Sequence, residues 1–424
     1  KDILMALGDY QNKNVVKRKG YKPNMKGDIK KIEEAVKLIK KAKRPIIYAG
    51  GGVINSGSSA SRLLTEFVRM TGFPCTLTLM GLGCYPASDK QFVGMLGMHG
   101  TYEANLCMHE CDVMIAIGAR FDDRITGRLD GFSPNSKKIQ IDIDPSSINK
   151  NVPVDIGIVG DVSVVLKDLI KVWKSNQEQY GKKDLKTWWT QIKDWKAINC
   201  LNFKTSGTII KPQYAIQRLF ELTKNLKKDT YISTEVGQHQ MWAAQYFGFD
   251  KPNRWMTSGG LGTMGYGLPA AMGAQVAHPE SLVVGIAGEA SFMMNMQELS
   301  TISQYKLPVK CFIINNFYMG MVRQWQELLH GSRYSQSYMD SLPDFVKLAE
   351  SFGMEGLRAT KVEEVDDVII QMIESDRAVI ADIQVDPKEN VFPMIPSGAS
   401  HNEMILSTQD KVKKPVSEEG MVLV

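Results

Sequence analysis

The stretch GIAGEASFMMNMQELSTISQYKLPVKCFIINNFYMGMVRQW, residues 285–325, decides the fold that we predict for the chain. It begins inside an apolar run, 282–287, continues through an amphipathic segment and reaches a second apolar run, 309–314. This order indicates strand, turn, helix and strand, the unit of an open parallel α/β sheet. Polar residues follow both predicted strands, Glu289 after the first and Asn316 after the second.

Ligands of an open α/β sheet bind outside the carboxyl ends of its strands. The carboxylate of Glu289 and the amide oxygen of Asn316 are therefore candidate ligands of one hard cation. Mg²⁺ prefers such oxygen ligands and usually binds phosphate as well. The backbone N–H groups of Ala290 and Ser291, at the start of the next helix, suit an anion. The alternative is an ordinary βαβ unit in which Glu289 and Asn316 only cap turns.

The 27-residue spacing between Glu289 and Asn316 resembles the GDG…NN motif of thiamine diphosphate enzymes. The segments FMMNMQELST, LPVK and GMVRQWQELLHGSRYS resemble the catalytic subunit of the acetolactate synthases, also called acetohydroxyacid synthases, more closely still. The family has Asp where this chain has Glu289. Because Mg²⁺ requires near-ideal octahedral geometry, the added methylene either shifts the backbone slightly or weakens the site.

Length and composition are those of a globular protein with more than one domain. The 424 residues suffice for two or three domains, and 43% of them are hydrophobic and 23% charged. The net charge of +5 and the dispersed basic residues do not indicate nucleic-acid binding. No apolar run reaches the roughly 18 residues of a membrane span. The six cysteines form no C-x-x-C pair, which predicts reduced thiols and a cytoplasmic location.

Residues 1–28 are polar, contain Pro23 and Gly27, and are predicted to be a linker. The chain begins with Lys1, and its first residues resemble the segment that leaves the first domain of the acetolactate synthases. The resemblance implies that an N-terminal pyrimidine-binding domain, which carries the family's catalytic glutamate, is missing. We therefore expect the chain alone to be inactive.

Residues 29–175 are predicted to form a central domain with a doubly wound parallel sheet. Strands are expected at 44–49, 73–78, 113–117, 138–145 and 156–161, alternating with helices. The segment 94–127, GMLGMHGTYEANLCMHECDVMIAIGARFDDRITG, resembles the FAD-binding part of the acetolactate synthases. The alternative is a set of turn glycines and helix caps. The resemblance assigns eight residues to the flavin: Gly97, Met98, His99, Gly100, Arg120, Asp122, Asp142 and Asp161.

Arg124 lies close to the same strand end as Arg120 and Asp122. The resemblance implies that its guanidinium holds the carboxylate of the incoming 2-oxo acid, a task for which the planar fork is suited. A salt bridge with the neighbouring aspartates is the alternative. In the family, FAD does no net redox work in the main reaction.

Residues 176–208 lack a strand pattern and are predicted to be a connecting helical segment. Leu185, Trp189, Ile192 and Trp195 form one apolar stripe at helical spacing. We expect this stripe to pack on its neighbours at the surface.

Residues 209–390 are predicted to form the thiamine diphosphate and Mg²⁺ domain, with a helix at 212–222 and strands at 230–234, 282–287, 309–314 and 378–385. The resemblance assigns Gln238 and His239 to the cofactor's diphosphate. Gly262 and Met264, in the glycine-rich stretch before a helix expected at 269–277, are also assigned to the cofactor, with Met264 as the wedge that bends it. Gly288, Ala290 and Ser291 complete this cofactor-binding set.

The backbone carbonyl of Tyr318 is expected as the third protein ligand of the metal, beside Glu289 and Asn316. The resemblance assigns Met321 and Trp325 to the substrate pocket, where Trp325 favours 2-oxobutanoate as the second substrate. Residues 391–424 are predicted to be a lid and tail, and the segment 393–398 resembles the part that closes over the family's active site.

The resemblance implies an enzyme that condenses two pyruvate molecules to 2-acetolactate, or pyruvate with 2-oxobutanoate, in branched-chain amino acid biosynthesis. It implies a homodimer or homotetramer with the active site at the interface, and a regulatory small subunit. Pyruvate oxidase and glyoxylate carboligase share this plan, but Trp325 and the RFDDR segment around Arg124 count against them. A non-catalytic paralogue is the other alternative, and only Glu289 supports it.

Overall fold

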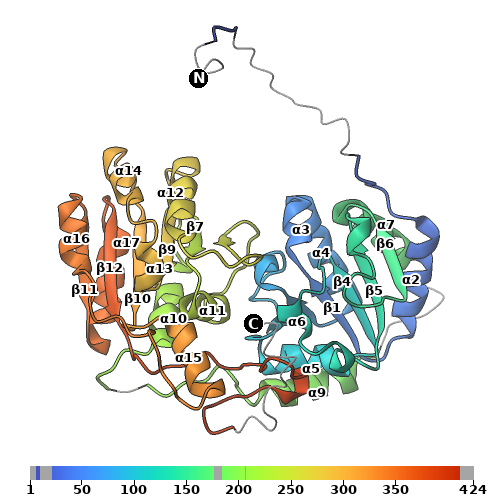
Figure 1. Cartoon of the computed structure of the whole chain (residues 1–424). Helices are drawn as coiled ribbons and strands as arrows, with labels where there is room; N and C mark the ends of the chain where they lie inside the picture. The colour runs from blue at the N-terminus through green and yellow to red at the C-terminus, as the bar shows by residue number, and fades with distance from the viewer. Residues whose placement is uncertain (1–5, 10–21, 176–183, 206, 411–424) are drawn as a thin grey trace.

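The computed structural model describes residues 6–9, 22–175, 184–205 and 207–410. These residues contain two α/β units, each built on a six-stranded sheet (Figure 1). The predicted linker 1–28, the connecting segment 176–208 and the tail 391–424 lie partly outside the described residues. The domain boundaries therefore stay predictions.

The first unit is a parallel sheet with the order β3-β2-β1-β4-β5-β6, the order of dinucleotide-binding sheets. The doubly wound fold predicted for this region is confirmed. The strand β3 was not predicted, because it is short and Gly94 interrupts its apolar pattern. The strands are β1 Pro45–Ala49, β2 Cys75–Leu77, β3 Phe92–Met95, β4 Val113–Ile117, β5 Lys137–Asp142 and β6 Ile156–Val159. The helices are α2 Ile29–Lys41, α3 Gly51–Asn55, α4 Ser58–Thr71, α5 Tyr102–Glu110, α6 Asp123–Thr126 and α7 Val162–Ser175.

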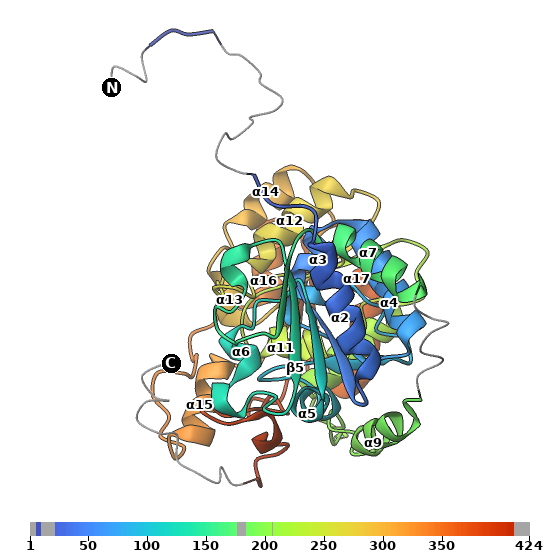
Figure 2. The ribbon, with the colours of Figure 1, turned by 90° about the vertical axis from the view of Figure 1, so that its right-hand side faces the viewer.

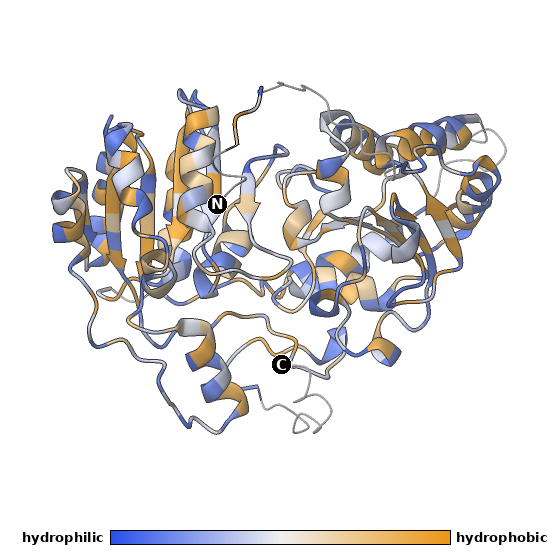
Figure 3. Cartoon of the chain, turned by 45° about the horizontal axis from the view of Figure 1, so that its top comes forward, coloured by the Kyte–Doolittle hydropathy of each residue, from blue (hydrophilic) through white to orange (hydrophobic). Residues whose placement is uncertain are grey.

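Helix α2 shows why these segments fold as they do. Asp28 caps its first turn by accepting a hydrogen bond from the backbone N–H of Lys30 at 2.9 Å. Its buried residues Ile32, Ala35, Val36 and Ile39 follow the helical repeat and face the sheet. Figures 2 and 3 show the strands enclosed by helices and rich in hydrophobic residues. Among the described residues, no helix is both long and apolar enough to cross a membrane.

The second unit is also a parallel sheet, with the order β11-β12-β10-β9-β7-β8. The strand, turn, helix and strand predicted from residues 282–316 are confirmed. The strands β8 and β11 were not predicted, because β8 has only three residues and β11 is mostly half-buried. The strands are β7 Thr230–Thr234, β8 Trp255–Thr257, β9 Leu282–Ala287, β10 Lys310–Asn315, β11 Glu355–Ala359 and β12 Val379–Gln384. The helices are α10 Pro212–Thr223, α11 Gln238–Tyr246, α12 Gly267–Ala277, α13 Glu289–Met293, α14 Glu298–Gln304, α15 Gly320–Leu329, α16 Phe345–Ser351 and α17 Val365–Glu374.

Helix α9, Lys186–Lys196, connects the two units and packs against α5 of the first one. Of the predicted stripe, Leu185 and Ile192 are buried, whereas Trp189 and Trp195 are only partly buried. The predicted stripe did not include Trp188, which is buried and donates a hydrogen bond from Nε1 to the Pro45 carbonyl at 3.0 Å. This bond ties the connecting helix to the first residue of β1.

Residues 389–405, called the C-terminal strap below, run from the second unit to the first along the lower side of the view in Figure 1. The backbone N–H of Ile395 donates to the Met98 carbonyl at 2.8 Å, and Met394 and Ile405 form an antiparallel bridge. His401, in a short 3₁₀ helix (His401–Glu403), contacts the Ile125 carbonyl through Nε2 at 2.6 Å. The strap therefore holds the two units together at the loop after β3 and at α6.

Candidate functional site

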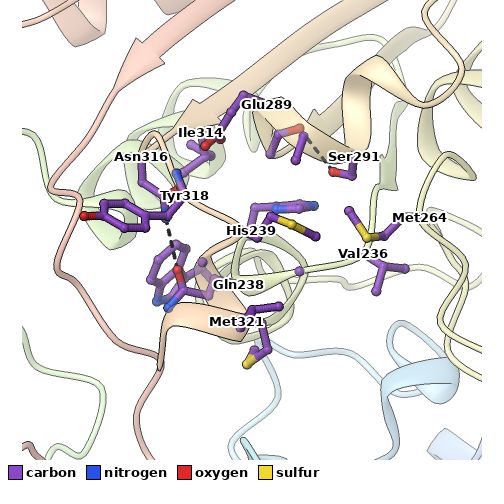
Figure 4. A pocket seen from close by; sticks show the side chains of 17 residues that line it. Val236, Gln238, His239, Met264, Glu289, Ser291, Ile314, Asn316, Tyr318 and Met321 are labelled. Atoms are coloured by element: carbon purple, nitrogen blue, oxygen red, sulfur yellow. Dashed lines mark hydrogen bonds between the residues drawn. The ribbon is translucent and has the colours of Figure 1, made fainter. Parts of the chain in front are cut away.

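A pocket of about 70 Å³ opens at the carboxyl ends of β7, β9 and β10 (Figure 4). In the second sheet β7 lies between β8 and β9, so the chain leaves β7 toward one side and returns on the other. Open α/β sheets bind ligands at such a reversal of strand order. The volume accommodates about two water molecules at roughly 30 Å³ each, enough for an ion or part of a larger ligand. The pocket is lined by Val236–His239, Trp242, Met264, Gly288–Ser291, Ile314, Asn316 and Tyr318–Val322.

Glu289 is the first residue of α13 and is only 1% exposed. No described residue forms a hydrogen bond with its Oε1. Burial raises the pKa of Glu289 to about 7, although the nearby backbone N–H groups of Glu289 itself, Tyr318 and Asn316 act in the opposite direction. A buried carboxylate oxygen without a partner is costly, and a cation beside it would remove that cost.

Asn316 follows β10 and is buried beside Glu289. Its Oδ1 accepts a hydrogen bond from the backbone N–H of Tyr318 at 3.1 Å, and its Nδ2 donates to Gln238 Oε1 at 3.1 Å. The described residues include no cluster of three or more His, Cys, Asp or Glu side chains that could hold a metal. A metal here would therefore have one carboxylate and neutral oxygens from Asn316 and Tyr318, a set that suits Mg²⁺ retaining water and phosphate.

His239 lies in the first turn of α11 and faces the pocket (Figure 4). Burial lowers its pKa to about 3, so the ring is neutral at physiological pH. Gly237 and Gly288 make room for the ring, because a Cβ on either would lie 2.8 Å from an imidazole atom. Ser291 donates its hydroxyl to the Gly288 carbonyl at 3.1 Å. The His239 ring and the Ser291 hydroxyl, which both line the pocket, are thus neutral groups.

Glu235 is a residue of this region that the sequence did not single out. It is 1% exposed, and its carboxylate accepts hydrogen bonds from the backbone N–H groups of Gly265 at 2.6 Å and Leu268 at 3.0 Å. Burial raises its pKa. These bonds hold the glycine-rich loop that brings Met264 to the pocket. The sequence feature that could have identified Glu235 is its position as an acidic residue directly after a buried strand.

The pocket brings together all but one of the cofactor and metal residues predicted on the second unit. The cofactor residue Gly262, with a φ of 76°, is not part of its lining. Of the two residues assigned to the substrate pocket, Met321 lines it and Trp325, half-buried on α15, does not. Arg124 is exposed on α6 of the first unit. The described pocket therefore does not include the side chain predicted to hold the substrate carboxylate.

The residues predicted to bind a flavin lie at or after the carboxyl ends of β3, β4, β5 and β6, which meet at one edge of the first sheet. Several of them already have partners. Arg120 pairs with Asp122. Asp142 accepts from the backbone N–H of Asp144 at 2.9 Å. Asp161 caps α7 through the backbone N–H of Ser163 at 3.0 Å.

The glycines of the loop after β3 are explained by packing within the chain. Gly97 has a φ of 102°, and a Cβ on it would lie 2.9 Å from the Arg124 carbonyl oxygen. A Cβ on Gly100 would lie 2.5 Å from the backbone of Leu96. Their conformations therefore give no separate indication of a flavin.

A second cavity, of about 320 Å³, lies between the β3 edge of the first sheet and α11 of the second unit. Its walls are largely apolar and aromatic and include Phe92, Tyr246 and Phe249, with His99 among the polar residues. His99 donates from Nδ1 to the Pro393 carbonyl at 3.1 Å, so its Nε2 is an acceptor, and no described residue hydrogen-bonds to it. The volume falls in the range of small-ligand pockets.

Comparison with known proteins relates both units to one class of enzyme. The family model described as "Thiamine pyrophosphate enzyme, central domain" matches residues 32–169, and "Thiamine pyrophosphate enzyme, C-terminal TPP binding domain" matches residues 235–383. The chain is 46% identical over 400 residues to the acetolactate synthase large subunit of Haemophilus influenzae, covering 94% of this chain and 69% of the relative. It is 45% identical over 416 residues to the acetolactate synthase isozyme 3 large subunit of Escherichia coli, covering 97% and 72%. It is 44% identical over 406 residues to a probable acetolactate synthase large subunit of Methanocaldococcus jannaschii, covering 94% and 67%.

Proposed function

Since the chain belongs to the family of acetolactate synthase large subunits, which are thiamine diphosphate-dependent enzymes, we propose its substrates and the residues that bind the cofactor and the substrates. The reaction is the condensation of two pyruvate molecules to 2-acetolactate and CO₂. With 2-oxobutanoate as the second substrate, the product is 2-aceto-2-hydroxybutanoate. The pocket at the ends of β7, β9 and β10 is the proposed binding site for the diphosphate end of the cofactor.

The buried Oε1 of Glu289, which has no described partner, is the observation that carries the site assignment. It lies beside Asn316 and Tyr318, and the three oxygen donors fit Mg²⁺. We assign the Glu289 carboxylate, the Asn316 amide oxygen and the Tyr318 carbonyl as its protein ligands. The backbone N–H groups of Ala290 and Ser291 and the neutral ring of His239 are the proposed neighbours of the diphosphate.

When bound, thiamine diphosphate supplies the electron sink for decarboxylation and carbon–carbon bond formation. The residues of the chain bind it, orient it and exclude water. Met264, on the loop held by Glu235, is the proposed support that bends the cofactor, and Met321 contributes an apolar wall. An apolar wall shields a reacting centre from protonation by water.

Three further assignments rest on the resemblance. Arg124 would hold the carboxylate of the second 2-oxo acid, and Trp325 would favour 2-oxobutanoate. Both require an arrangement in which these side chains approach the pocket. FAD would bind along the strand ends of the first sheet and the loop 97–100, and of the residues assigned to it His99 lines the cavity of about 320 Å³. We assign FAD no step in the reaction.

The proposed assembly is a homodimer or homotetramer with the active site at an interface between copies, together with a regulatory small subunit. The relatives described as large subunits support such a partner. The chain covers 69% of the length of the Haemophilus protein and 72% of that of the Escherichia protein.

Acetolactate formation from pyruvate tests the proposed function. The chain is assayed with Mg²⁺, thiamine diphosphate and FAD, alone and mixed with an N-terminal domain of the acetolactate synthase family. We expect acetolactate in the mixture. Acetyl phosphate from pyruvate, phosphate and O₂ would instead indicate a pyruvate oxidase. Tartronate semialdehyde, in a parallel assay with glyoxylate as the substrate, would indicate a glyoxylate carboligase. The absence of both product and thiamine diphosphate binding would refute the function.

Glu289 itself favours one second candidate, a non-catalytic paralogue that keeps the fold. The family has Asp at this position, and a longer side chain changes the position of the carboxylate. The comparison of wild type with Glu289→Asp across a Mg²⁺ titration separates the two functions. Equal turnover means that Glu289 serves as a ligand, whereas turnover only with Asp means that the chain has lost the reaction.

A further inference from the structure

Two buried glutamines connect the candidate metal ligand Asn316 with the C-terminal strap. The backbone N–H of Val391, in the strap, donates to Gln324 Oε1 at 2.8 Å. Gln238 Nε2 donates to the same oxygen at 2.9 Å, and Asn316 Nδ2 donates to Gln238 Oε1 at 3.1 Å. All four residues are at most 5% exposed. The chain of hydrogen bonds therefore runs through the protein interior, where water does not compete for the partners.

The direction of this chain is fixed at its strap end. A backbone N–H can only donate, so Val391 requires the oxygen of Gln324 and not its NH₂ group. The Val391 carbonyl accepts from Gln324 Nε2 at 3.2 Å, which fixes the same orientation a second time. Gln238 must then present its NH₂ group to Gln324 and its oxygen to Asn316. Asn316 in turn must present its NH₂ group to Gln238 and its oxygen to Tyr318, whose backbone N–H donates to that oxygen at 3.1 Å and favours the same orientation.

We propose that Gln324 is a positioning residue, through which the docked strap, together with the backbone N–H of Tyr318, holds the Asn316 carboxamide in the orientation that binds the cation of the pocket. The inference rests on the proposed function, in which the oxygen of Asn316 is a metal ligand. An inverted carboxamide would present an NH₂ group, which cannot bind a cation. Removal of a residue that hydrogen-bonds to a metal ligand typically lowers metal affinity about 10- to 100-fold.

The surrounding contacts leave the two glutamines little freedom. Gln324 Nε2 also approaches Met394 Sδ at 3.5 Å, and Gln238 Nε2 also donates to the Glu389 carbonyl at 3.1 Å. Both additional partners belong to the strap. Gly320 leaves space for the hydrogen bond between Asn316 and Gln238, because a Cβ there would overlap Gln238 Oε1 and lie 2.8 Å from Asn316 Nδ2.

The strap has separate anchors at each end of this segment. On the second unit, Arg323 donates to the Glu389 carbonyl and to Asn390 Oδ1, both at 2.7 Å. On the first unit, Ile395 bonds to the Met98 carbonyl at 2.8 Å. Undocking of the strap would remove the Val391 donor, and Gln324 would then be free to invert. The position of the strap on the first unit is thus linked to the cation site of the second.

Binding of Mn²⁺ in the presence of thiamine diphosphate tests the inference without any turnover. Mn²⁺ stands in for Mg²⁺, and electron paramagnetic resonance measures the free ion. In the full chain, we expect Gln324→Met to raise the Mn²⁺ dissociation constant about 10-fold or more. Gln324→Asn, which keeps the amide but withdraws it by one methylene, is expected to act in the same direction and carries the test if Gln324→Met does not fold.

Gln275→Met is the matched control. Gln275 is 1% exposed and donates to three carbonyls after α12, those of His278, Pro279 and Ser281, so its loss removes a buried glutamine network away from the pocket. Its Mn²⁺ dissociation constant is expected to equal that of wild type. A comparable rise in this variant would mean that the effect is general destabilisation, and would overturn the inference.

A double-variant comparison distinguishes a relay from two independent contacts. If Gln324 acts through Gln238, combining Gln238→Met with Gln324→Met raises the dissociation constant no further than the larger single effect. An additive effect, or an unchanged constant in the Gln324 variants, would overturn the inference and leave the proposed function intact. Wild type without thiamine diphosphate-dependent Mn²⁺ binding would instead refute the proposed cofactor site, and the inference with it.

Discussion

Replacing Glu289 by Gln is expected to stabilise the metal-free chain and to abolish its stabilisation by Mg²⁺. Burial raises the pKa of Glu289 from its ordinary value of 4.5 to about 7. A carboxyl group with a raised pKa in the folded state imposes no cost below pH 4.5. The cost grows as pH rises and is complete above pH 7. A shift of this size corresponds to about 3 kcal/mol at pH 8.

Glu289→Gln removes this cost while keeping the shape of the side chain. We expect the thermal midpoint of the affected unit, in EDTA at pH 8, to rise by roughly 6–12 °C, and the difference to shrink toward zero near pH 4.5. Mg²⁺ and thiamine diphosphate at about 100 times the dissociation constant should stabilise the wild type by about 2.7 kcal/mol. The Gln variant should not respond, because it lacks the anionic ligand. Differential scanning calorimetry with and without the ligands measures both effects.

Glu235→Gln is a matched control, since Glu235 is equally buried but already accepts two backbone hydrogen bonds. A Gln there places an NH₂ group against a backbone N–H and is expected to destabilise by about 1–3 kcal/mol. The reasoning about Glu289 is refuted if its Gln variant unfolds earlier than wild type in EDTA at pH 8. It is also refuted if Mg²⁺ with thiamine diphosphate stabilises both proteins equally.

Gly320→Ala should weaken Mn²⁺ binding about 10-fold, because the added methyl group displaces Gln238 from its hydrogen bonds. Electron paramagnetic resonance of the free ion measures the dissociation constant, and an unchanged constant would contradict the packing argument. The strap should lose stability as pH falls from 6.5 through 4, by up to about 3 kcal/mol, because burial lowers the pKa of His401 to about 4 and protonation favours the undocked state. Hydrogen exchange of the strap amides checks this. His401→Asn should remove the contribution of His401 to the pH dependence, with the bond to Ile125 lost at every pH, and leave that of His99, whose pKa burial also lowers to about 4 and which bonds to Pro393 in the strap. Trp188→Phe should lower the thermal midpoint by the equivalent of about 1–3 kcal/mol, because a carbonyl of β1 loses its buried donor; an unchanged midpoint would mean that water replaces the indole.

The elements of the two sheets were largely readable from local pattern. Apolar runs bounded by glycine and polar residues marked β1, β4, β9 and β10, because strands buried on both faces need continuous apolar sequence. The same reasoning missed β3, β8 and β11. Their residues are few or interrupted by glycine, and neighbouring strands hold them in place through ladder hydrogen bonds. A short strand at or near a sheet edge has no sequence signature of its own.

The polar residues of the pocket were predictable for a different reason. Glu289 and Asn316 directly follow buried strands, and parallel strands deliver such residues to one edge of the sheet. The residues that position them were not predictable in this way. Gln324 bonds to Val391 across 67 residues of sequence and to Gln238 across 86, and no local pattern relates these positions.

By itself, then, the sequence determined the fold class, the family and the strand ends at which the pocket lies, since each depends on residues that are neighbours in the chain. Only the tertiary structure decided that Glu289 Oε1 has no described partner, that Glu235 holds the loop of Met264, and that the strap reaches Asn316 through Gln324. These facts depend on which buried donors and acceptors meet once distant segments pack together. Hydrogen bonds are decided by distance and direction in space, and the order of residues in a chain does not specify either one.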